Sequence, residues 1–225
     1  DALLKGLHPC QQRLAFEELL AHYLSLRKVR LQAATESALA IKEGGDTVKQ
    51  FLSSLPFTLT AAQQRVVAEI LADLERPHPM MRLIQGDVGS GKTVVAAIAC
   101  LKAIASGVQA AIMAPTEILA EQHYRSFSDW LRPLGIEPAW LSGSQRAAAR
   151  RESLAAIAGG DAQLIVGTHA LFQEGVEFHR LGLVVIDEQH RFGVHQRMAL
   201  REKGVSADGQ PHQLVMTATP TDRGI

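Results

Sequence analysis

An eight-residue segment of this chain has the composition and spacing of a phosphate-binding loop. Residues 86–93 read Gly-Asp-Val-Gly-Ser-Gly-Lys-Thr and match the pattern G-x-x-x-x-G-K-S/T at every fixed position. Glycines let the backbone curl so that successive N–H groups point at phosphate oxygens, and a helix that opens near Lys92 adds the positive end of its dipole. Lys92 is placed to reach the β- and γ-phosphates, and the Thr93 hydroxyl to hold Mg²⁺. A Gly-rich turn that merely joins a strand to a helix is the alternative. The residues predicted to contact the nucleotide phosphates are Gly86, Asp87, Gly89, Ser90, Gly91, Lys92 and Thr93.

Two adjacent carboxylates, Asp187 and Glu188, follow the apolar run 183–186. A strand that ends in two carboxylates is what a Walker B site requires: Asp187 holds Mg²⁺ through water, and Glu188 polarises the attacking water. In the alternative, Asp187 caps the next helix and Glu188 is a solvated residue of its first turn. The phosphate-binding loop upstream favours the first interpretation. Lys92, Asp187 and Glu188 are therefore the predicted catalytic residues, and Thr93 and Asp187 the predicted metal ligands.

Both motifs need a strand before them, and the sequence from Pro56 onward alternates short apolar runs with amphipathic segments. The pattern predicts strands at residues 82–85, 110–114, 139–141, 163–166, 183–186 and 213–216, and helices at residues 92–106, 117–131 and 145–158. Short buried strands separated by helices indicate an α/β fold with a parallel sheet and helices on both faces. Ligands bind such sheets at the carboxyl ends of the strands.

The N-terminal part of the chain has a different character. Residues 11–42 contain no Gly or Pro and place apolar residues at helical spacing, which predicts one long helix or two shorter ones that end at Gly44 and Gly45. We expect residues 1–55 to form a helical linker or arm that packs on the side of the main body, and residues 56–225 to form the ATP-binding domain.

Composition limits the class of protein. The chain has 225 residues, 47% hydrophobic and 20% charged, which excludes a disordered chain, a collagen-like fibre and a disulfide scaffold. Lys plus Arg equals Asp plus Glu at 23 each, so net charge neither supports nor forbids nucleic acid as a partner. Cys10 and Cys100 have no metal-ligand spacing and indicate a reduced, cytoplasmic-type protein with two small buried thiols. No apolar stretch approaches the roughly 20 residues of a membrane span. Both ends of the chain look cut, so we expect a piece of a larger protein.

Residues 187–194, Asp-Glu-Gln-His-Arg-Phe-Gly-Val, resemble motif II of the RecG family of superfamily 2 DNA helicases and translocases. The related transcription-repair coupling factor family, Mfd, typically has Glu where this chain has Gln189. Four more segments are similar to the nucleotide-recognition motif and to motifs Ia, Ib and III of these proteins: residues 57–63, 114–123, 167–171 and 217–220. The resemblance covers roughly residues 55–220 and implies a RecA-like P-loop NTPase lobe. The N-terminal stretch is similar to the linker that joins the RecG wedge domain to its motor. Residues 221–224 depart from the family, which usually has Ile-Pro-Arg-Thr there.

On the nucleotide side, the resemblance implies that the Gln63 amide recognises adenine and that Phe57 packs against the base. An exposed helix position for Gln63 and a core position for Phe57 are the alternatives. Gln189 and His190 are expected to bind the nucleotide. The threonines of motif III, Thr217 and Thr219, are expected to couple the ATP site to the DNA site.

On the DNA side, hydroxyl and N–H groups at strand ends can bind the sugar-phosphate backbone without reading bases. The residues that the resemblance assigns to DNA are Thr116, Glu117, Gln122, Thr168 and His169, with His123 beside them. Ser142 and Gly143, next to Ser144, are another candidate contact with the DNA phosphates. Ordinary helix capping by Thr116 and Thr168 is the alternative that local chemistry favours. For the arginines of residues 146–151, a solvated helix face is the favoured interpretation.

The resemblance implies the first lobe of a motor that uses ATP and Mg²⁺ to move on branched double-stranded DNA, reversing replication forks and migrating Holliday junctions. The complete protein is expected to be monomeric and to act in the bacterial cytoplasm, at the nucleoid. We expect the isolated chain to be nearly inactive, because a second lobe supplies the arginine finger in such motors. Two alternatives are open: a lobe of an RNA helicase, and a non-catalytic, ATP-gated scaffold that binds a partner through residues 11–42.

Overall fold

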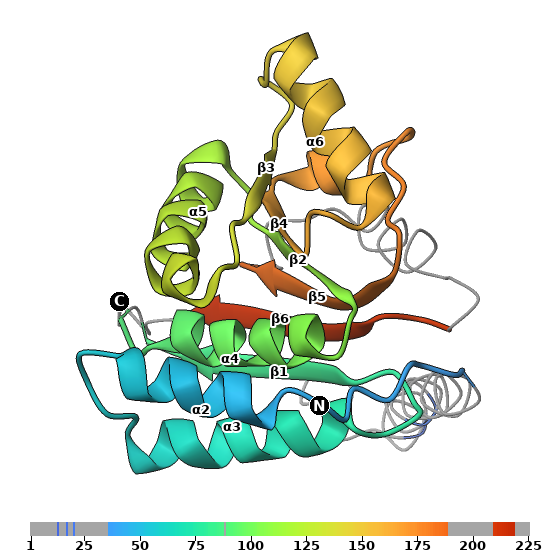
Figure 1. The fold of residues 1–225 in the computed structure, drawn as a ribbon. Coiled ribbons are helices and arrows are strands. Elements are labelled where there is room, and N and C mark those ends of the chain that lie inside the picture. The colour runs from blue at the N-terminus through green and yellow to red at the C-terminus, as the bar shows by residue number, and fades with distance from the viewer. Residues whose placement is uncertain are drawn as a thin grey trace, which may run out of the picture. The chain divides into compact units, whose positions relative to one another are not determined.

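The computed structural model describes residues 36–87, 89–188 and 209–218, together with Arg13, Glu17 and Leu20. The chain divides into two compact units, Asp1–Glu36 and Ser37–Ile225. In the first unit Arg13, Glu17 and Leu20 are helical, as predicted, and Arg13 Nε donates to Glu17 Oε1 at 3.0 Å. The fold described below is that of the second unit (Figure 1).

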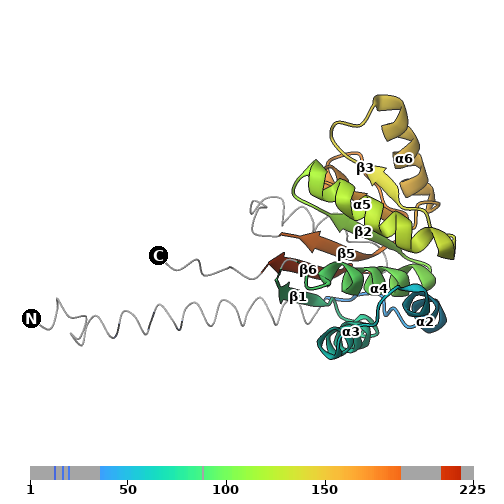
Figure 2. The same cartoon turned by 90° about the vertical axis from the view of Figure 1, so that its left-hand side faces the viewer.

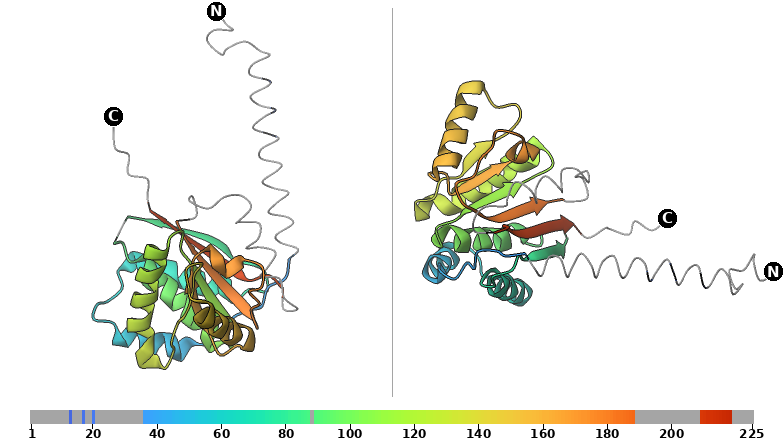
Figure 3. Two further views of the ribbon diagram at one scale, coloured as in Figure 1. Left: turned by 90° about the horizontal axis from the view of Figure 1, so that it is seen from above. Right: turned by 90° about the vertical axis from the view of Figure 1, so that its right-hand side faces the viewer.

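The described residues of the second unit form a six-stranded sheet in which every pairing is parallel, in the order β1-β6-β5-β2-β4-β3. The strands are β1 Met81–Gly86, β2 Gln109–Met113, β3 Ala139–Leu141, β4 Leu164–Gly167, β5 Leu181–Asp187 and β6 His212–Ala218. Each predicted strand is present, with bounds that differ by no more than two residues. The arrowheads of β1, β5 and β6 point toward the same edge of the sheet, which is the edge where the sequence predicts the ligand site (Figures 2 and 3).

Helices pack on both faces of the sheet, as predicted. The helices are α2 Gly45–Ser54, α3 Ala61–Leu74, α4 Lys92–Ala105, α5 Glu117–Leu131 and α6 Ala147–Gly159, with short 3-10 helices η1 Arg132–Leu134 and η2 His169–Phe172. Alternate residues of β5 separate the two sides, since Leu183 and Val185 share a core with α2 to α5, whereas Val184 and Ile186 share one with α6 and η2. Among the residues that the structure describes, no helix is long and apolar enough to cross a membrane.

The predicted N-terminal arm requires a correction. Residues 37–44 are not helical, and Gly44, with φ 99°, precedes α2 as its N-cap instead of ending a helix. A Cβ at Gly44 would lie 2.8 Å from the Cβ of Ala105, so this glycine is needed for the close approach of the chain to α4. Val48 and Phe51 of α2 are buried in the main core. The unit that contains the sheet therefore begins at Ser37, not after residue 55.

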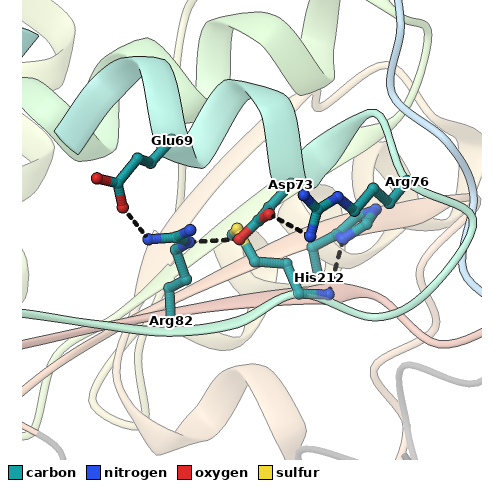
Figure 4. Close-up of polar contacts among 6 residues, drawn as sticks. Glu69, Asp73, Arg76, Arg82 and His212 are labelled. Atoms are coloured by element: carbon teal, nitrogen blue, oxygen red, sulfur yellow. Dashed lines mark hydrogen bonds and ion pairs between the residues drawn. The ribbon is translucent and has the colours of Figure 1, made fainter. Parts of the chain in front are cut away.

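Charged side chains join α3 to the edge strand β1 (Figure 4). Arg82 of β1 pairs with Glu69 of α3 at 2.6 Å and also with Asp73. Asp73 in turn binds Arg76 at 3.0 Å. These pairs hold the helix that carries Gln63 beside the strand that leads into the phosphate-binding loop.

His212 is a buried histidine at the start of β6. Its Nδ1 accepts a hydrogen bond from the Met80 N–H at 3.0 Å, and its Nε2 donates to the Leu39 carbonyl at 2.8 Å. Burial lowers the pKa of His212, which keeps the ring neutral. The ring therefore joins the segment before α2, the segment before β1 and the first residue of β6.

Candidate functional site

The phosphate-binding loop has the backbone conformation that its glycines predict. Gly86 ends β1, Lys92 opens α4, and Gly89 and Gly91 between them have φ values of 81° and 82°. A Cβ at Gly91 would lie 2.3 Å from the Gln63 Nε2 atom, so both the backbone angle and the neighbouring side chain require glycine. The loop is thus shaped by contiguous residues of one segment.

Lys92 lies against its own loop. Its Nζ atom donates to the carbonyl oxygens of Gly86 at 2.6 Å and Asp87 at 2.8 Å. The ammonium group is therefore held within the curl of the loop, where a bound phosphate would compete with the two carbonyls for it. Thr93 follows in the first turn of α4.

The loop and the acidic pair line one cavity of about 340 Å³. Its lining residues are Gly89, Lys92, Thr93, Leu119, Gln122, His123, Asp187, Glu188, Met216 and Ala218. Strand β6 lies between β1 and β5, so the ends of those two strands are about 10 Å apart. Residues of the two predicted motifs therefore line one cavity, and the binding roles predicted for them stay predictions.

Glu188 has the only positive φ angle, 52°, among the non-glycine residues that the structure describes. The left-handed region costs a non-glycine residue roughly 1–3 kcal/mol, and such strain gathers at functional sites. The Glu188 N–H donates to the Met216 carbonyl on β6 at 2.9 Å, which holds this conformation. The carboxylate predicted to direct water therefore leaves the strand at a sharply turned residue.

Gln122 and His123 were predicted to face DNA, and the structure places both on the nucleotide cavity instead. His123 Nε2 lies 2.7 Å from Asp187 Oδ2, and the two side chains are only 10% and 13% exposed. The physical reason is that α5 packs against β2 and β4, and β2 is the neighbour of β5, so the first turns of α5 begin next to the end of β5. That neighbour relation follows from the strand order, which sequence spacing does not reveal.

A second cavity, of about 430 Å³, shares Gly89, Lys92 and Thr93 with the first. It is lined by Phe57, Thr58, Thr60, Gln63, Gly89, Gly91, Lys92, Thr93, Val94 and Trp130. Phe57 is 45% exposed, so the core alternative for this residue is wrong, and an exposed ring beside the loop is suited to stack on a base. Sequence reasoning missed Trp130, which comes from the last turn of α5; no local pattern marks it.

Gln63 is bonded to both the start of α3 and the loop. Its Oε1 accepts from the Thr60 N–H at 2.8 Å, which with the reciprocal Thr60 bond forms a capping box. Its Nε2 donates to the Ser90 carbonyl at 2.9 Å. The amide keeps one hydrogen and one lone pair for an adenine edge. Gln63 is therefore not an ordinary solvated helix residue.

At the opposite half of the sheet edge, hydrogen bonds join two protein segments that were predicted to contact DNA. Thr116 caps α5, since its Oγ1 accepts from the Leu119 N–H at 3.3 Å. Glu117 Oε1 accepts from the Ser144 hydroxyl at 2.7 Å and the Ser144 N–H at 3.3 Å. The Ser144 hydroxyl holds the pKa of Glu117 below its ordinary value. Exposed Gly143 lies in the same loop.

Two of the predicted DNA residues are buried. Thr168 is 3% exposed, and its hydroxyl accepts from the Ala170 N–H to cap η2, so the capping alternative describes it. Ser142 is 1% exposed, with its hydroxyl 3.2 Å from that of Ser144. Their predicted side-chain contacts with DNA are therefore corrected, because neither hydroxyl reaches the surface. His169 is exposed, and Arg150 donates to the Ser142 carbonyl at 3.1 Å.

Of the predicted coupling residues, Thr217 lies near the end of β6 and its hydroxyl donates to the Ala218 carbonyl at 3.3 Å. Gln189, His190 and Thr219 lie outside the described residues, as do Cys10 and residues 221–224. Their predicted roles stay predictions.

A parallel sheet of this order, with a glycine loop at the end of β1 and two carboxylates at the end of β5, defines a RecA-like P-loop NTPase lobe. Residues 60–225 match the family described as DEAD/DEAH box helicase. The chain belongs to this family.

Within this family, the chain is similar to several proteins named RecG. The chain is 59% identical to the ATP-dependent DNA helicase RecG of Pasteurella multocida over 223 residues, which are 99% of this chain and 32% of the relative. It is 57% identical to RecG of Escherichia coli K12 over 218 residues, 97% of this chain and again 32% of the relative. A solved structure of RecG bound to a three-way DNA junction matches with a TM-score of 0.82 and 41% identity, over 93% of this chain and 27% of that one. The chain thus spans about a third of the length of these relatives.

Proposed function

We propose that this chain is the ATP-binding lobe of a RecG-type motor, which couples ATP hydrolysis to movement along branched double-stranded DNA. Such a motor reverses replication forks and migrates Holliday junctions. The observation that carries the proposal is the single cavity lined by Lys92, Thr93, Asp187 and Glu188. Its chemistry fits the ATP dependence stated for relatives that are up to 59% identical.

The chain's own residues divide the work of binding ATP. The loop N–H groups and Lys92 bind the β- and γ-phosphates, while Phe57 and Gln63 hold the base in the second cavity. Glu188 orients the attacking water and accepts its proton.

The donor set fits Mg²⁺. Thr93 and Asp187 offer hard oxygen ligands in one cavity, and the residues that the structure describes contain no group of three or more His, Cys, Asp or Glu side chains that could hold a metal ion. Two protein oxygens completed by phosphates and water are typical of Mg²⁺ in nucleotide sites. When bound, Mg²⁺ would neutralise charge on the phosphate oxygens.

The track edge consists of Thr116, Glu117, Gly143 and His169, exposed residues that follow β2, β3 and β4. Backbone and hydroxyl groups there would contact the sugar-phosphate chain without reading sequence, as a motor requires. We propose branched DNA as the track because the RecG structure that resembles this chain holds a three-way junction. The complete protein would act as a monomer in the bacterial cytoplasm, at the nucleoid.

The RNA-helicase alternative is not favoured, since the relatives that match nearly the whole chain are DNA helicases. The scaffold alternative gives no reason for a strained Glu188 beside a complete phosphate loop.

The test is ATP hydrolysis by a protein that joins this lobe to a second motor lobe and a wedge domain. Rates are compared without nucleic acid and with forked DNA, linear duplex and RNA. We expect the largest stimulation with forks and its loss in Glu188→Gln. Equal rates on all tracks, or stimulation by RNA alone, would show that the track is misassigned.

A further inference from the structure

The histidine at position 123 has a contact that the proposed function leaves unexplained. His123 Nε2 lies 2.7 Å from Asp187 Oδ2, with both side chains almost fully buried. A carboxylate only accepts hydrogen bonds, so the imidazole donates. A charge-assisted bond of this length in a poorly solvated place is strong enough to select one orientation of the carboxylate.

The imidazole is itself held in place. Its ring meets the buried ring of Phe127 edge-on, with centroids 6.5 Å apart and an interplanar angle of 69°. Phe127 contacts Trp130, which contacts Phe51 of α2. This row of rings anchors His123 in the core, so that the donor is fixed before any ligand arrives.

The bond leaves part of the Asp187 carboxylate for another partner. Two oxygens offer about four lone-pair sites, of which Nε2 takes one on Oδ2. Asp187 and Thr93 line the same cavity, so a cation bound there could use the remaining sites. His123 would then relate to Asp187 as an outer-shell partner that orients a metal ligand.

From this geometry we propose that His123 is a positioning residue that orients Asp187 for Mg²⁺. The inference rests on the proposed function and adds to it a determinant of metal affinity outside motif II. Loss of the donor lets the carboxylate rotate, which weakens Mg²⁺ in the nucleotide complex and leaves metal-free nucleotide binding unchanged. Outer-shell partners of this kind alter metal affinity by roughly 10- to 100-fold.

The test measures how much free Mg²⁺ is needed for half-maximal binding of a fluorescent, non-hydrolysable ATP analogue by the 225-residue chain. We expect His123→Ala and His123→Leu to raise this requirement roughly 10- to 100-fold, with unchanged binding of the analogue in EDTA. His123→Gln, whose amide can donate to the same oxygen, should stay near wild type. Arg125→Ala is the matched control, because Arg125 is on the same helix but 73% exposed and paired with Glu121.

A double-mutant experiment shows whether His123 acts through Asp187. In the Asp187→Ala background, His123→Ala should add no further loss. An unchanged Mg²⁺ requirement in His123→Ala, an equal loss in the Asp187→Ala background, or a His123→Gln variant as weak as His123→Leu would overturn the inference. Failure of the wild-type chain to bind the analogue, with or without metal, would instead overturn the proposed function and this inference with it.

Discussion

The two halves of the sheet edge are built in different ways. The nucleotide half depends on residues 86–93, a contiguous loop whose conformation comes from its own glycines. The other half, which we propose contacts DNA and call the track half, consists of segments after β2, β3 and β4, where polar side chains bind the protein's own backbone. A contiguous motif therefore predicts a site well, whereas a polar residue at a strand end predicts a cap as readily as a contact with a ligand.

One helix contributes to both halves. α5 begins at Thr116 and Glu117 on the track side, whereas Leu119 at the end of its first turn and Gln122 and His123 in its second line the nucleotide cavity. Glu117 and His123 are six residues apart, which is about 9 Å along the helix axis. Substitutions that change one half and leave the other unchanged can therefore test whether nucleotide binding and DNA binding are separable.

The largest effect is expected at Lys92. Lys92→Ala should weaken binding of an ATP analogue about 100-fold, since it removes charge-assisted bonds to phosphate. Fluorescence titration measures the affinity. Lys49→Ala, on the exposed face of α2, is the control and should bind like wild type. An analogue affinity in Lys92→Ala equal to that of wild type would show that Lys92 does not bind the nucleotide phosphates.

A pair of glycine substitutions contrasts the halves directly. Gly91→Ala puts a Cβ against Gln63 in a left-handed conformation, so it should distort the loop at a cost of roughly 1–3 kcal/mol and weaken analogue binding. Gly143→Ala, in the track half, meets no atom within 4 Å and has no positive φ, so nucleotide binding should not change. Thermal unfolding and analogue titration of both variants give the comparison. Similar losses in the two variants would mean that the halves are not separable.

Acid should destabilise the lobe as a whole and not one half. Burial lowers the pKa of His212 in the folded state, so its contribution to stability is present above the unfolded pKa of about 6.5 and is lost as pH falls below that value. We expect the free energy of unfolding to fall as the pH falls below about 6.5, with a smaller slope in His212→Asn. Urea unfolding at several pH values measures both slopes. An unchanged slope in the variant would show that His212 does not stay neutral when folded.

The smallest effect is expected at the hydrogen bond between Ser144 and Glu117 in the track half. Ser144→Ala removes the hydroxyl that binds Glu117 and should reduce DNA affinity of the motor by a modest factor, with nucleotide affinity unchanged. Ser53→Ala, whose hydroxyl binds only a carbonyl of its own helix, serves as the control. Fluorescence anisotropy on forked DNA is the measurement. A larger loss of nucleotide binding than of DNA binding would contradict the division into halves.

Much of the fold was predictable because short buried strands and amphipathic helices have clear periods, and each predicted strand is present. The helix predicted through residue 42 was wrong after residue 36. Gly44 permits a close approach of the chain to α4, but in sequence a glycine pair with this role looks the same as one that ends a helix. Lys92, Asp187 and Glu188 line one cavity, as expected for motifs that follow strand ends, and their catalytic roles stay predictions. The surroundings of His123 and Trp130 could not be predicted, since they depend on the strand order and on helix packing, which no local spacing encodes.

The central claim is that the cavity between the ends of β1 and β5 binds the phosphates of ATP. A crystal structure of the chain with Mg²⁺ and a non-hydrolysable ATP analogue tests it most directly. We expect phosphate oxygens on the N–H groups of residues 86–93 and on Lys92, with Thr93 and Asp187 holding the metal. Phosphates elsewhere on the lobe, or a metal held by other residues, would contradict it.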